Sequence, residues 1–321
     1  MSGLSHGCLK RRVLSFILLL ASLVAILFSF RSVVFSPHPR VVVSGEGYGS
    51  TSRPDIDTLT QTLTVRLSEA EIDRKIVPNI SCDEEKDVRR PCVNRNCTKK
   101  LPSSPQERLL QLLERKFQLP VVTYGSVIHR IADNISQQDY IFVTAASSNH
   151  FEESRALLKN LRERVFSQLQ KYLLVFINLG LNNQEKEELA KQEDVHLADF
   201  PFHDLPPHIS TLWCYSWKPL IIQALLPKTK LLIYMDSSVR FLENATVSWL
   251  FQRAVERGLQ FLRNPQSVFL HTVDATFNYY GDQACQYQPF PEILAGFGVY
   301  HNEDFVRRAV VAPWASCALV P

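Results

Sequence analysis

The 321-residue sequence lacks an excess of charge of either sign, since 35 Lys and Arg residues face 32 Asp and Glu residues. This balance excludes a protein that binds nucleic acid through bulk positive charge, so we expect no nucleic-acid partner. Glycine is scarce, with 11 residues against 18 prolines and no period, which excludes a collagen-like chain. Hydrophobic residues make up 45% and charged residues 21%, a composition typical of globular protein rather than of disorder.

The sequence also lacks several motifs that announce common chemistries. It contains no Gly-x-Ser-x-Gly elbow, no Gly-x4-Gly-Lys-Ser/Thr phosphate loop, no His-Glu-x-x-His and no paired Cys-x-x-Cys. The absence of these motifs disfavours an α/β-hydrolase, a P-loop nucleotidase and a zinc protease.

One long apolar run is present, at Val13 to Phe30, where 18 residues pass without a charge, Pro or Gly. As a helix it would span about 27 Å, close to the hydrocarbon thickness of a bilayer. Lys10, Arg11 and Arg12 precede the run, which favours a cytosolic N-terminus. We therefore predict a cytosolic tail at 1–12 and an uncleaved signal anchor at 13–35, giving a single-pass type II protein. The alternative is a cleaved signal peptide, whose apolar region is normally only about 7–15 residues.

Both interpretations place most of the chain in the secretory lumen. Four Asn-x-Ser/Thr acceptor sites for N-glycans agree with this placement: Asn79, Asn96, Asn134 and Asn244. All cysteines except Cys8 would then face an oxidising compartment, so we expect disulfide bonds, whose pairing the sequence does not fix.

The pattern changes near residue 135. Residues 36–135 are irregular and rich in Pro, with one helix expected after Ser104, and we interpret them as a lumenal stem. From 136 to 321, apolar runs alternate with segments of helical spacing. The runs are 140–145, 172–178, 195–200 and 231–235, and the helical segments are 153–170, 184–192 and 219–226. This alternation predicts an α/β domain with a mostly parallel sheet and helices on both faces.

In such sheets, ligands bind beyond the carboxyl ends of the strands. Ser147, Ser148 and Asn149 follow the first apolar run, and Asp236 follows the run at 231–235. An acid in that position either caps a turn or holds a cation or ligand at the sheet edge, and the pattern alone leaves both open.

Four motifs of this domain resemble those of a known protein family. They are Trp217-Lys-Pro219, Met235-Asp-Ser-Ser-Val-Arg-Phe241, Ala295-Gly-Phe-Gly298 and Pro313-Trp-Ala-Ser-Cys-Ala-Leu319. Together they resemble a family of animal type II membrane proteins whose lumenal domains are similar to glycosyltransferases of the GT-A type, a Rossmann-type nucleotide-sugar-binding fold. The resemblance runs from Tyr140 to the end of the sequence. It implies a Golgi membrane protein that transfers a sugar from a nucleotide donor to a glycan or glycoprotein.

The resemblance also implies where a cation would bind. In metal-dependent GT-A enzymes an Asp-x-Asp motif holds Mn²⁺ or Mg²⁺, which offsets the charge of the diphosphate. Asp236 matches the first acid, but Ser238 stands at the second. A metal site would therefore need a further ligand from the C-terminal part: His271, Asp274 or His301. Alternatively, Lys218 and Arg240 supply the positive charge with no metal.

The remaining candidates follow from the same motifs. The set predicted to bind the nucleotide sugar is Ser147, Ser148, Asn149, Trp217, Lys218, Ser237, Arg240 and Gly296. An inverting enzyme needs a carboxylate to activate the acceptor, for which Asp274 and Glu292 are the candidates. Gly296 would let the backbone pass close to the sugar, and the structural alternatives are a core position for Trp217 and a turn role for Gly296.

A second function fits the sequence as well. Because the second acid of the metal motif is missing, the chain could be a non-catalytic lumenal module with a degenerate transferase fold. The sequence stops at Pro321, shortly after the last motif, which we interpret as a truncated gene product or a fragment.

Overall fold

The computed structural model describes residues 56–69, 105–242, 247–268, 271–287 and 291–320. These residues belong to one compact unit, Pro54–Pro321. The predicted tail at 1–12 and anchor at 13–35 lie outside the described residues. Within the described ranges, no helix is both long and apolar enough to cross a membrane.

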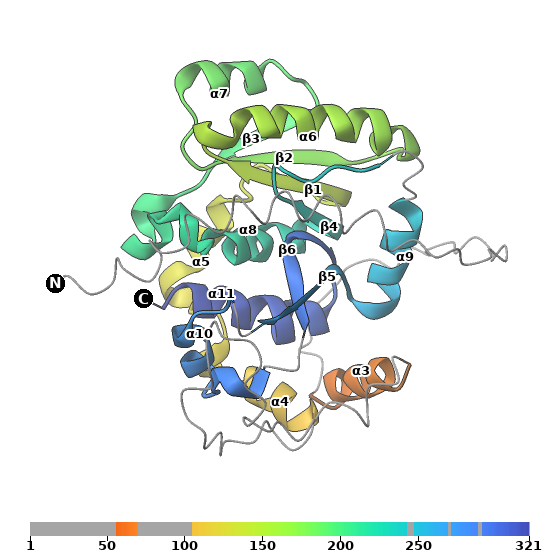
Figure 1. Cartoon of the computed structure of the whole chain (residues 1–321), viewed down its shortest axis with the longest axis vertical. Helices are drawn as coiled ribbons and strands as arrows, with labels where there is room; N and C mark the ends of the chain where they lie inside the picture. Colours follow the sequence, from red (N-terminus) through yellow and green to blue (C-terminus); the bar gives the residue numbers. More distant parts are fainter. Residues whose placement is uncertain (1–55, 70–104, 243–246, 269–270, 288–290, 321) are drawn as a thin grey trace, which may run out of the picture. The chain divides into compact units, whose positions relative to one another are not determined.

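A six-stranded sheet with the order β3-β2-β1-β4-β6-β5 forms the centre of the unit (Figure 1). Its strands are β1 (Gln138–Ala146), β2 (Leu173–Asn178), β3 (Val195–Asp199), β4 (Thr229–Met235), β5 (Leu259–Ser267) and β6 (Pro291–His301). The first four run parallel, whereas β6 is antiparallel to both β4 and β5. The prediction of a mostly parallel α/β sheet is confirmed, and the two antiparallel strands are an addition to it.

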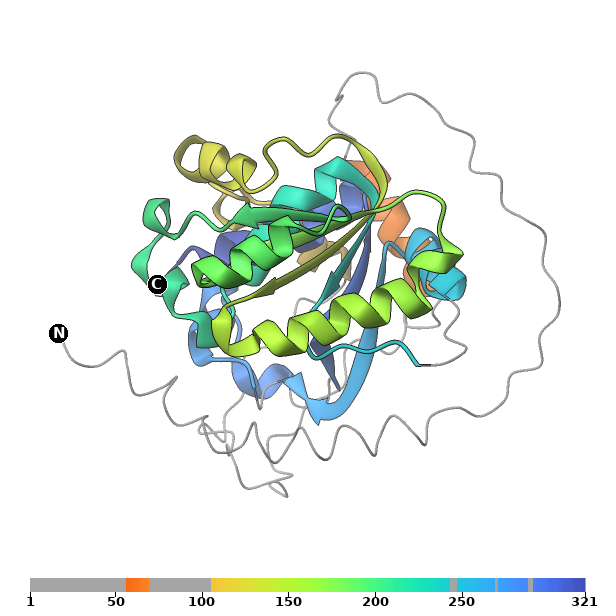
Figure 2. The same ribbon diagram turned by 90° about the horizontal axis from the view of Figure 1, so that it is seen from above.

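Helices cover both faces of this sheet (Figure 2). One face packs against α5 (Val121–Arg130), α8 (Trp217–Leu225) and α11 (Ala312–Ala318), and the other against α6 (Phe151–Arg164) and α9 (Val247–Arg257). Strand β1 explains the two layers, since Ile141 and Val143 belong to one core cluster and Phe142 to the other. Successive side chains of a strand point to opposite faces, so an uninterrupted apolar strand needs cover on both.

Local sequence signals set the ends of several helices. Helix α7 (Asn183–Ala190), beside β3, begins with a capping box in which Asn182 and Glu185 bond each other's backbone N–H. Helix α8 carries Pro219 in its first turn, where a missing N–H costs nothing, and begins two residues before it. The predicted helices at 153–170, 184–192 and 219–226 are therefore present with shifted ends.

Two helices that precede α5 in the segment predicted as a stem also pack within the compact unit, as α5 itself does. They are α3 (Ile56–Glu69) and α4 (Pro105–Leu112), and Leu59 and Leu109 form a small apolar cluster with Ala309. Arg66 of α3 forms a two-pronged ion pair with Glu303.

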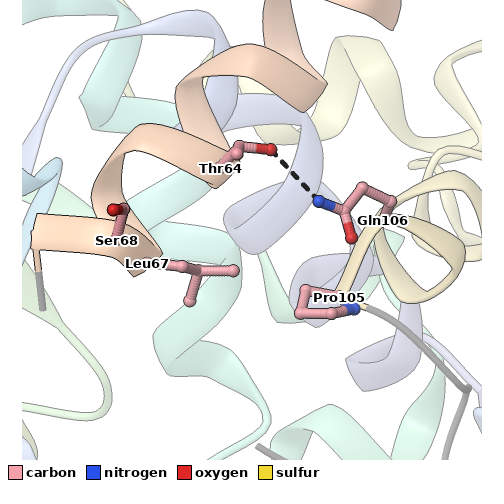
Figure 3. Close-up of a pocket in the computed structure, with 5 residues that line it drawn as sticks. All are labelled: Thr64, Leu67, Ser68, Pro105 and Gln106. Carbon is pink, nitrogen blue, oxygen red and sulfur yellow. Dashed lines mark hydrogen bonds between the residues drawn. The ribbon is translucent and has the colours of Figure 1, made fainter. Parts of the chain in front are cut away.

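A shallow pocket of about 150 Å³ lies between α3 and α4 (Figure 3). Its lining residues are Thr64, Leu67, Ser68, Pro105 and Gln106. Gln106 donates a hydrogen bond to the Thr64 hydroxyl at 3.1 Å. This pocket belongs to the contact between the two helices, away from the sheet edge at which ligands are expected.

Candidate functional site at the carboxyl edge of the sheet

Asp236 is the first polar residue after the buried β4 run. Its backbone N–H donates to the Gly296 carbonyl of β6 at 2.8 Å, which fixes where the chain leaves the sheet. The side chain is 31% exposed. The carboxylate therefore stands at the carboxyl edge, accessible to a ligand rather than sealed in the core.

Both carboxylate oxygens of Asp236 accept a hydrogen bond from the protein. The Lys218 ammonium donates to Oδ2 at 2.8 Å, and the Tyr234 hydroxyl donates to Oδ1 at 2.7 Å. Burial, reinforced by the negative charge of Asp236, raises the pKa of Tyr234 far above its usual range. The phenol consequently stays protonated and remains a donor.

Lys218 lies in the first turn of α8, and its side chain is only 6% exposed. The ammonium is 4.6, 5.6 and 5.4 Å from the ring centroids of Tyr215, Trp217 and Tyr234. Aromatic faces attract a cation, but a buried charge still requires an opposite charge. Asp236 supplies it, so the lysine and the aspartate are held as a pair.

The loop after β4 is bonded to the loop and helix after β1. The Glu153 carboxylate accepts from the Ser237 hydroxyl at 3.0 Å and lies 2.9 Å from the His150 Nδ1. The Arg240 guanidinium donates to the Glu153 carbonyl at 2.9 Å. Two segments more than 80 residues apart in the sequence thus form one continuous edge.

Arg240 is used differently from the prediction. Besides the Glu153 carbonyl, its guanidinium donates to the carbonyls of Ser237 and Val239. Burial also lowers the pKa of Arg240. Because its donors bind two carbonyls of the loop and one of α6, Arg240 in this structure ties the loop to α6 and is not presented as a free phosphate-binding group.

The predicted serines and asparagine after β1 separate into two groups. Ser148 donates to the Gly180 carbonyl and the Glu185 carboxylate, so it joins the cap of α7 instead of facing a ligand. Ser147 donates to the Asn149 side chain at 2.5 Å, and Asn149 is exposed. Ser147 and Asn149 are therefore the members of this group available to a ligand.

Trp217 belongs to the core. It is 4% exposed, and its indole N–H donates to the Leu212 carbonyl at 3.2 Å, so it offers no open face to a base or sugar. The exposed aromatic residues nearby are Trp213 and Tyr215, at 56% and 52%. Tyr215 has φ +55°, a left-handed conformation that costs a residue with a Cβ free energy. No local pattern in the sequence reveals this strained position.

Gly296 allows β6 to pass close to the site. A Cβ built on this residue would lie 3.0 Å from the Asp236 Oδ2 atom. The missing side chain of Gly296 therefore leaves room for the Asp236 carboxylate, and its predicted contact with a sugar stays a prediction.

The predicted metal ligands do not assemble around Asp236. His271 bonds the Glu292 carboxylate through Nδ1 at 2.7 Å, and Asp274 is the exposed first residue of α10 (Asp274–Tyr279). Ser238 is exposed, and no three His, Cys, Asp or Glu side chains in the described part of the chain are placed to share a metal ion.

The electrostatics of the pair give a second reason against a metal ion at Asp236. A divalent ion on this carboxylate would lie roughly 5 Å from the Lys218 ammonium, a repulsion on the order of 7 kcal/mol at an effective dielectric of about 20. The residues present therefore do not fit the Mn²⁺ or Mg²⁺ that the motif implies.

Few of the features predicted for a lumenal protein fall on described residues. Asn134 is exposed, as a glycan acceptor must be, and has φ +64°. Asn79, Asn96 and Asn244 lie outside the described residues. Cys317 is half-buried and forms no disulfide among the residues that the structure describes. Burial raises the pKa of its thiol.

Residues 109–223 match a family described as "Protein of unknown function (DUF1647)". The match covers about a third of the chain. It spans β1 to α8 and therefore includes Lys218 but not Asp236. No curated protein sequence matches the chain.

Several solved glycosyltransferases have a similar arrangement of elements. Core-mannan synthase A from Aspergillus fumigatus, in its Mn/GDP form, is 10% identical over 60% of this chain and 68% of its own, with a TM-score of 0.40. The galactosyltransferase LgtC, with donor and acceptor sugar analogues, is 13% identical over 56% and 69%, with a TM-score of 0.37. Mouse xyloside xylosyltransferase 1 is 12% identical over 56% and 73%, also with a TM-score of 0.37. At these values the likeness assigns no role to any residue of this chain.

Proposed function

We propose that the chain is a glycosyltransferase-type protein that binds a nucleotide-sugar donor at the carboxyl edge of its sheet. The observation that carries this proposal is the partly exposed Asp236 carboxylate, on a loop bonded to the loop after β1. Ligands of open parallel sheets bind at this edge, between loops of neighbouring strands. The motif around Asp236, which resembles GT-A enzymes, supports the same assignment.

Each side chain at the edge has a defined part in this proposal. An ionised carboxylate has about four acceptor positions, of which Lys218 and Tyr234 fill two on Asp236. The remaining positions accept hydroxyl groups of the donor, while Ser147 and Asn149 contact it from the adjoining loop. Gly296 keeps the carboxylate in place by leaving room for it.

The acceptor-activating base is best assigned to Glu292. Its carboxylate lies 2.7 Å from His271, so an adjacent imidazole can share the proton that a general base removes. Asp274, the other candidate, is the exposed first residue of α10. The reaction then moves the sugar from the nucleotide to a hydroxyl of a glycan or glycoprotein.

The cellular setting follows from the sequence. We propose that residues 13–35 anchor the protein in a secretory-pathway membrane, in the Golgi, with the described unit on the lumenal side. The apolar run at 13–30, the basic residues before it and the exposed acceptor Asn134 support this orientation. Removal of N-glycans should increase the gel mobility of the protein expressed in cells, and an Asn134→Gln variant should shift less.

Thermal unfolding of the full-length chain in mild detergent, with a panel of nucleoside diphosphates, tests the proposal. Binding to the folded state raises Tm, and the Asp236→Asn variant should lose that shift. The matched control is Asp139→Asn, because Asp139 forms a Lys–Asp pair with Lys230 at the opposite edge of the sheet. If no nucleotide raises Tm, or if Asp139→Asn removes the shift equally, the proposed donor site is refuted.

A second candidate, a non-catalytic lumenal module, has a specific observation in its favour. The second acid of the metal motif is absent at Ser238, and the first is already neutralised by Lys218. Such a module would bind a nucleotide or glycan without transferring sugar. Sugar transfer by the wild-type chain that Asp236→Asn abolishes would exclude it.

A further inference from the structure

The Lys218–Asp236 pair bears on how the proposed donor is bound. An ammonium group has three N–H donors. One meets Asp236 Oδ2 at 2.8 Å, and the Ala295 carbonyl lies 3.5 Å away. The rings of Tyr215 and Tyr234 cover the remaining sides. The cation is therefore held in a fixed, almost fully buried position beside Asp236.

Release of Lys218 from Asp236 would be costly. The side chain is 6% exposed, so an ammonium that gave up the carboxylate would be left buried beside aromatic rings without a counter-charge. A divalent cation that bound Asp236 would either displace the Lys218 ammonium into that unpaired state or remain close to its positive charge, on the same carboxylate.

The neighbouring carboxylate does not replace the missing second acid. Glu153 is the carboxylate bonded to the Asp236 loop, and it accepts from Ser237 and pairs with His150. Magnesium and manganese ions normally take several oxygen ligands, including at least one free carboxylate. Asp236 and Glu153 are both already bonded to donors of the protein, so neither is the free carboxylate that such an ion takes.

We propose that Lys218 is the fixed cation of this site, that Asp236 is not a metal ligand, and that a nucleoside diphosphate binds here without a divalent ion. The inference rests on the proposed function for the class of ligand. It assigns Lys218 as the residue that sets metal independence. In metal-dependent relatives of the motif the carboxylate is neutralised by the metal ion, whereas here the chain neutralises it with its own side chain.

Manganese alone tests the first part, with free Mn²⁺ followed by electron paramagnetic resonance. Full-length wild type and Asp236→Asn should bind the same amount of Mn²⁺. The Lys218→Met variant fills the aromatic surroundings with an uncharged chain of similar length, leaves Asp236 as an anion, and should bind one more Mn²⁺. The Lys218→Met/Asp236→Asn double variant should return to the wild-type amount.

Two results would overturn the inference in this assay. One is a wild-type Mn²⁺ site that Asp236→Asn abolishes. The other is a folded Lys218→Met variant that gains no Mn²⁺, because Lys218 would then not be what excludes the ion. If Lys218→Met fails to fold, the comparison of wild type with Asp236→Asn decides the question alone.

Titration with UDP and GDP, each in EDTA and in excess Mn²⁺, tests the second part. Wild-type affinity for the nucleotide that binds should agree within about twofold between the two conditions. Lys218→Met should bind at least about tenfold more weakly in EDTA than in Mn²⁺. Lys230→Met, which removes the lysine of the pair at the opposite edge, should behave as wild type.

The two proposals fail in different ways. Wild-type binding that requires Mn²⁺ would overturn metal independence and leave the donor site standing. No nucleotide binding in either condition would refute the donor site. The Mn²⁺ experiment would still test whether Lys218 excludes a divalent ion from Asp236.

Discussion

Two glycines of β6 offer a test that separates the site from the core. A Cβ added at Gly296 would lie 3.0 Å from Asp236 Oδ2, which must shift by a few tenths of an ångström on its bonds to Lys218 and Tyr234. A Cβ at Gly298 would lie 2.7 Å from a ring carbon of Phe261, which is partly buried and packs against the core. Gly296→Ala should therefore disturb the carboxylate, and Gly298→Ala should disturb the fold.

The expected magnitudes differ accordingly. Overpacking of a well-filled core costs about 1–3 kcal/mol, so Gly298→Ala should lower Tm by roughly 2–10 °C for a unit of this size. Gly296→Ala should cost less than about 1 kcal/mol of stability, because the atom it meets is a partly exposed side chain, yet weaken nucleotide binding about tenfold. Chemical unfolding and nucleotide titration of both variants provide the measurement. This account of the site would be refuted if Gly296→Ala bound the nucleotide with wild-type affinity, or if the two variants were equally destabilised.

Three further predictions concern contacts around the same unit. Hydrogen bonds from His301 and Arg66 outweigh the effect of burial and lower the pKa of Glu303 from 4.5 to about 2. The Arg66–Glu303 ion pair therefore stabilises the fold above about pH 4.5, and this stabilisation is lost as the pH falls towards 2. Arg66→Met should cost about 1–3 kcal/mol in urea unfolding at pH 7 and almost nothing near pH 2, and a cost independent of pH would contradict this. Tyr215→Gly relieves the left-handed strain, so stability should stay within about 1 kcal/mol while nucleotide affinity falls, and unchanged affinity would remove Tyr215 from the site. Glu153→Ala should weaken nucleotide binding by separating the two loops, whereas its exposed neighbour Glu152→Ala should not, and equal effects would argue against the link.

The parallel half of the sheet was predictable from the sequence for a physical reason. Strands β1, β2 and β4 are buried on both faces, so each is a short apolar run that no surface element would carry. The position of Asp236 followed from the same logic, since the first polar residue after such a run must stand at the sheet edge.

The antiparallel half was not predictable in this way. Strand β5 lies at the edge of the sheet and contains Pro265, and β6 contains Gly296 and Gly298 in its interior. Proline and glycine normally argue against a strand, and an edge strand needs no continuous apolar run. The pairing of β6 with β4, and of β5 with β6, overrides these local preferences.

Roles of single side chains depended on contacts that no spacing encodes. Trp217 and Lys218 are neighbours in the first turn of α8, yet the indole enters the core and the ammonium reaches Asp236. Arg240 follows the motif aspartate closely, but the carbonyls it binds include that of Glu153, on a different element. Sequence predicted the edge where the site lies, and the tertiary contacts decided which of its residues face outward.

Binding and transfer place separate demands on this edge. Affinity for a donor can come from Asp236 and the loop after β1, which are in place. Transfer additionally needs positive charge near the departing diphosphate, because negative charge builds on its oxygens as the sugar leaves. Lys218 is fixed on Asp236, and Arg240 is bonded to two loop carbonyls and to that of Glu153 on α6. A catalytic cycle that draws on these two cations therefore requires Arg240 to exchange a carbonyl partner for phosphate, whereas a binding module requires no such exchange. Nucleotide binding without sugar transfer would accordingly favour the module, and transfer in EDTA that Arg240→Met abolishes would favour the exchange.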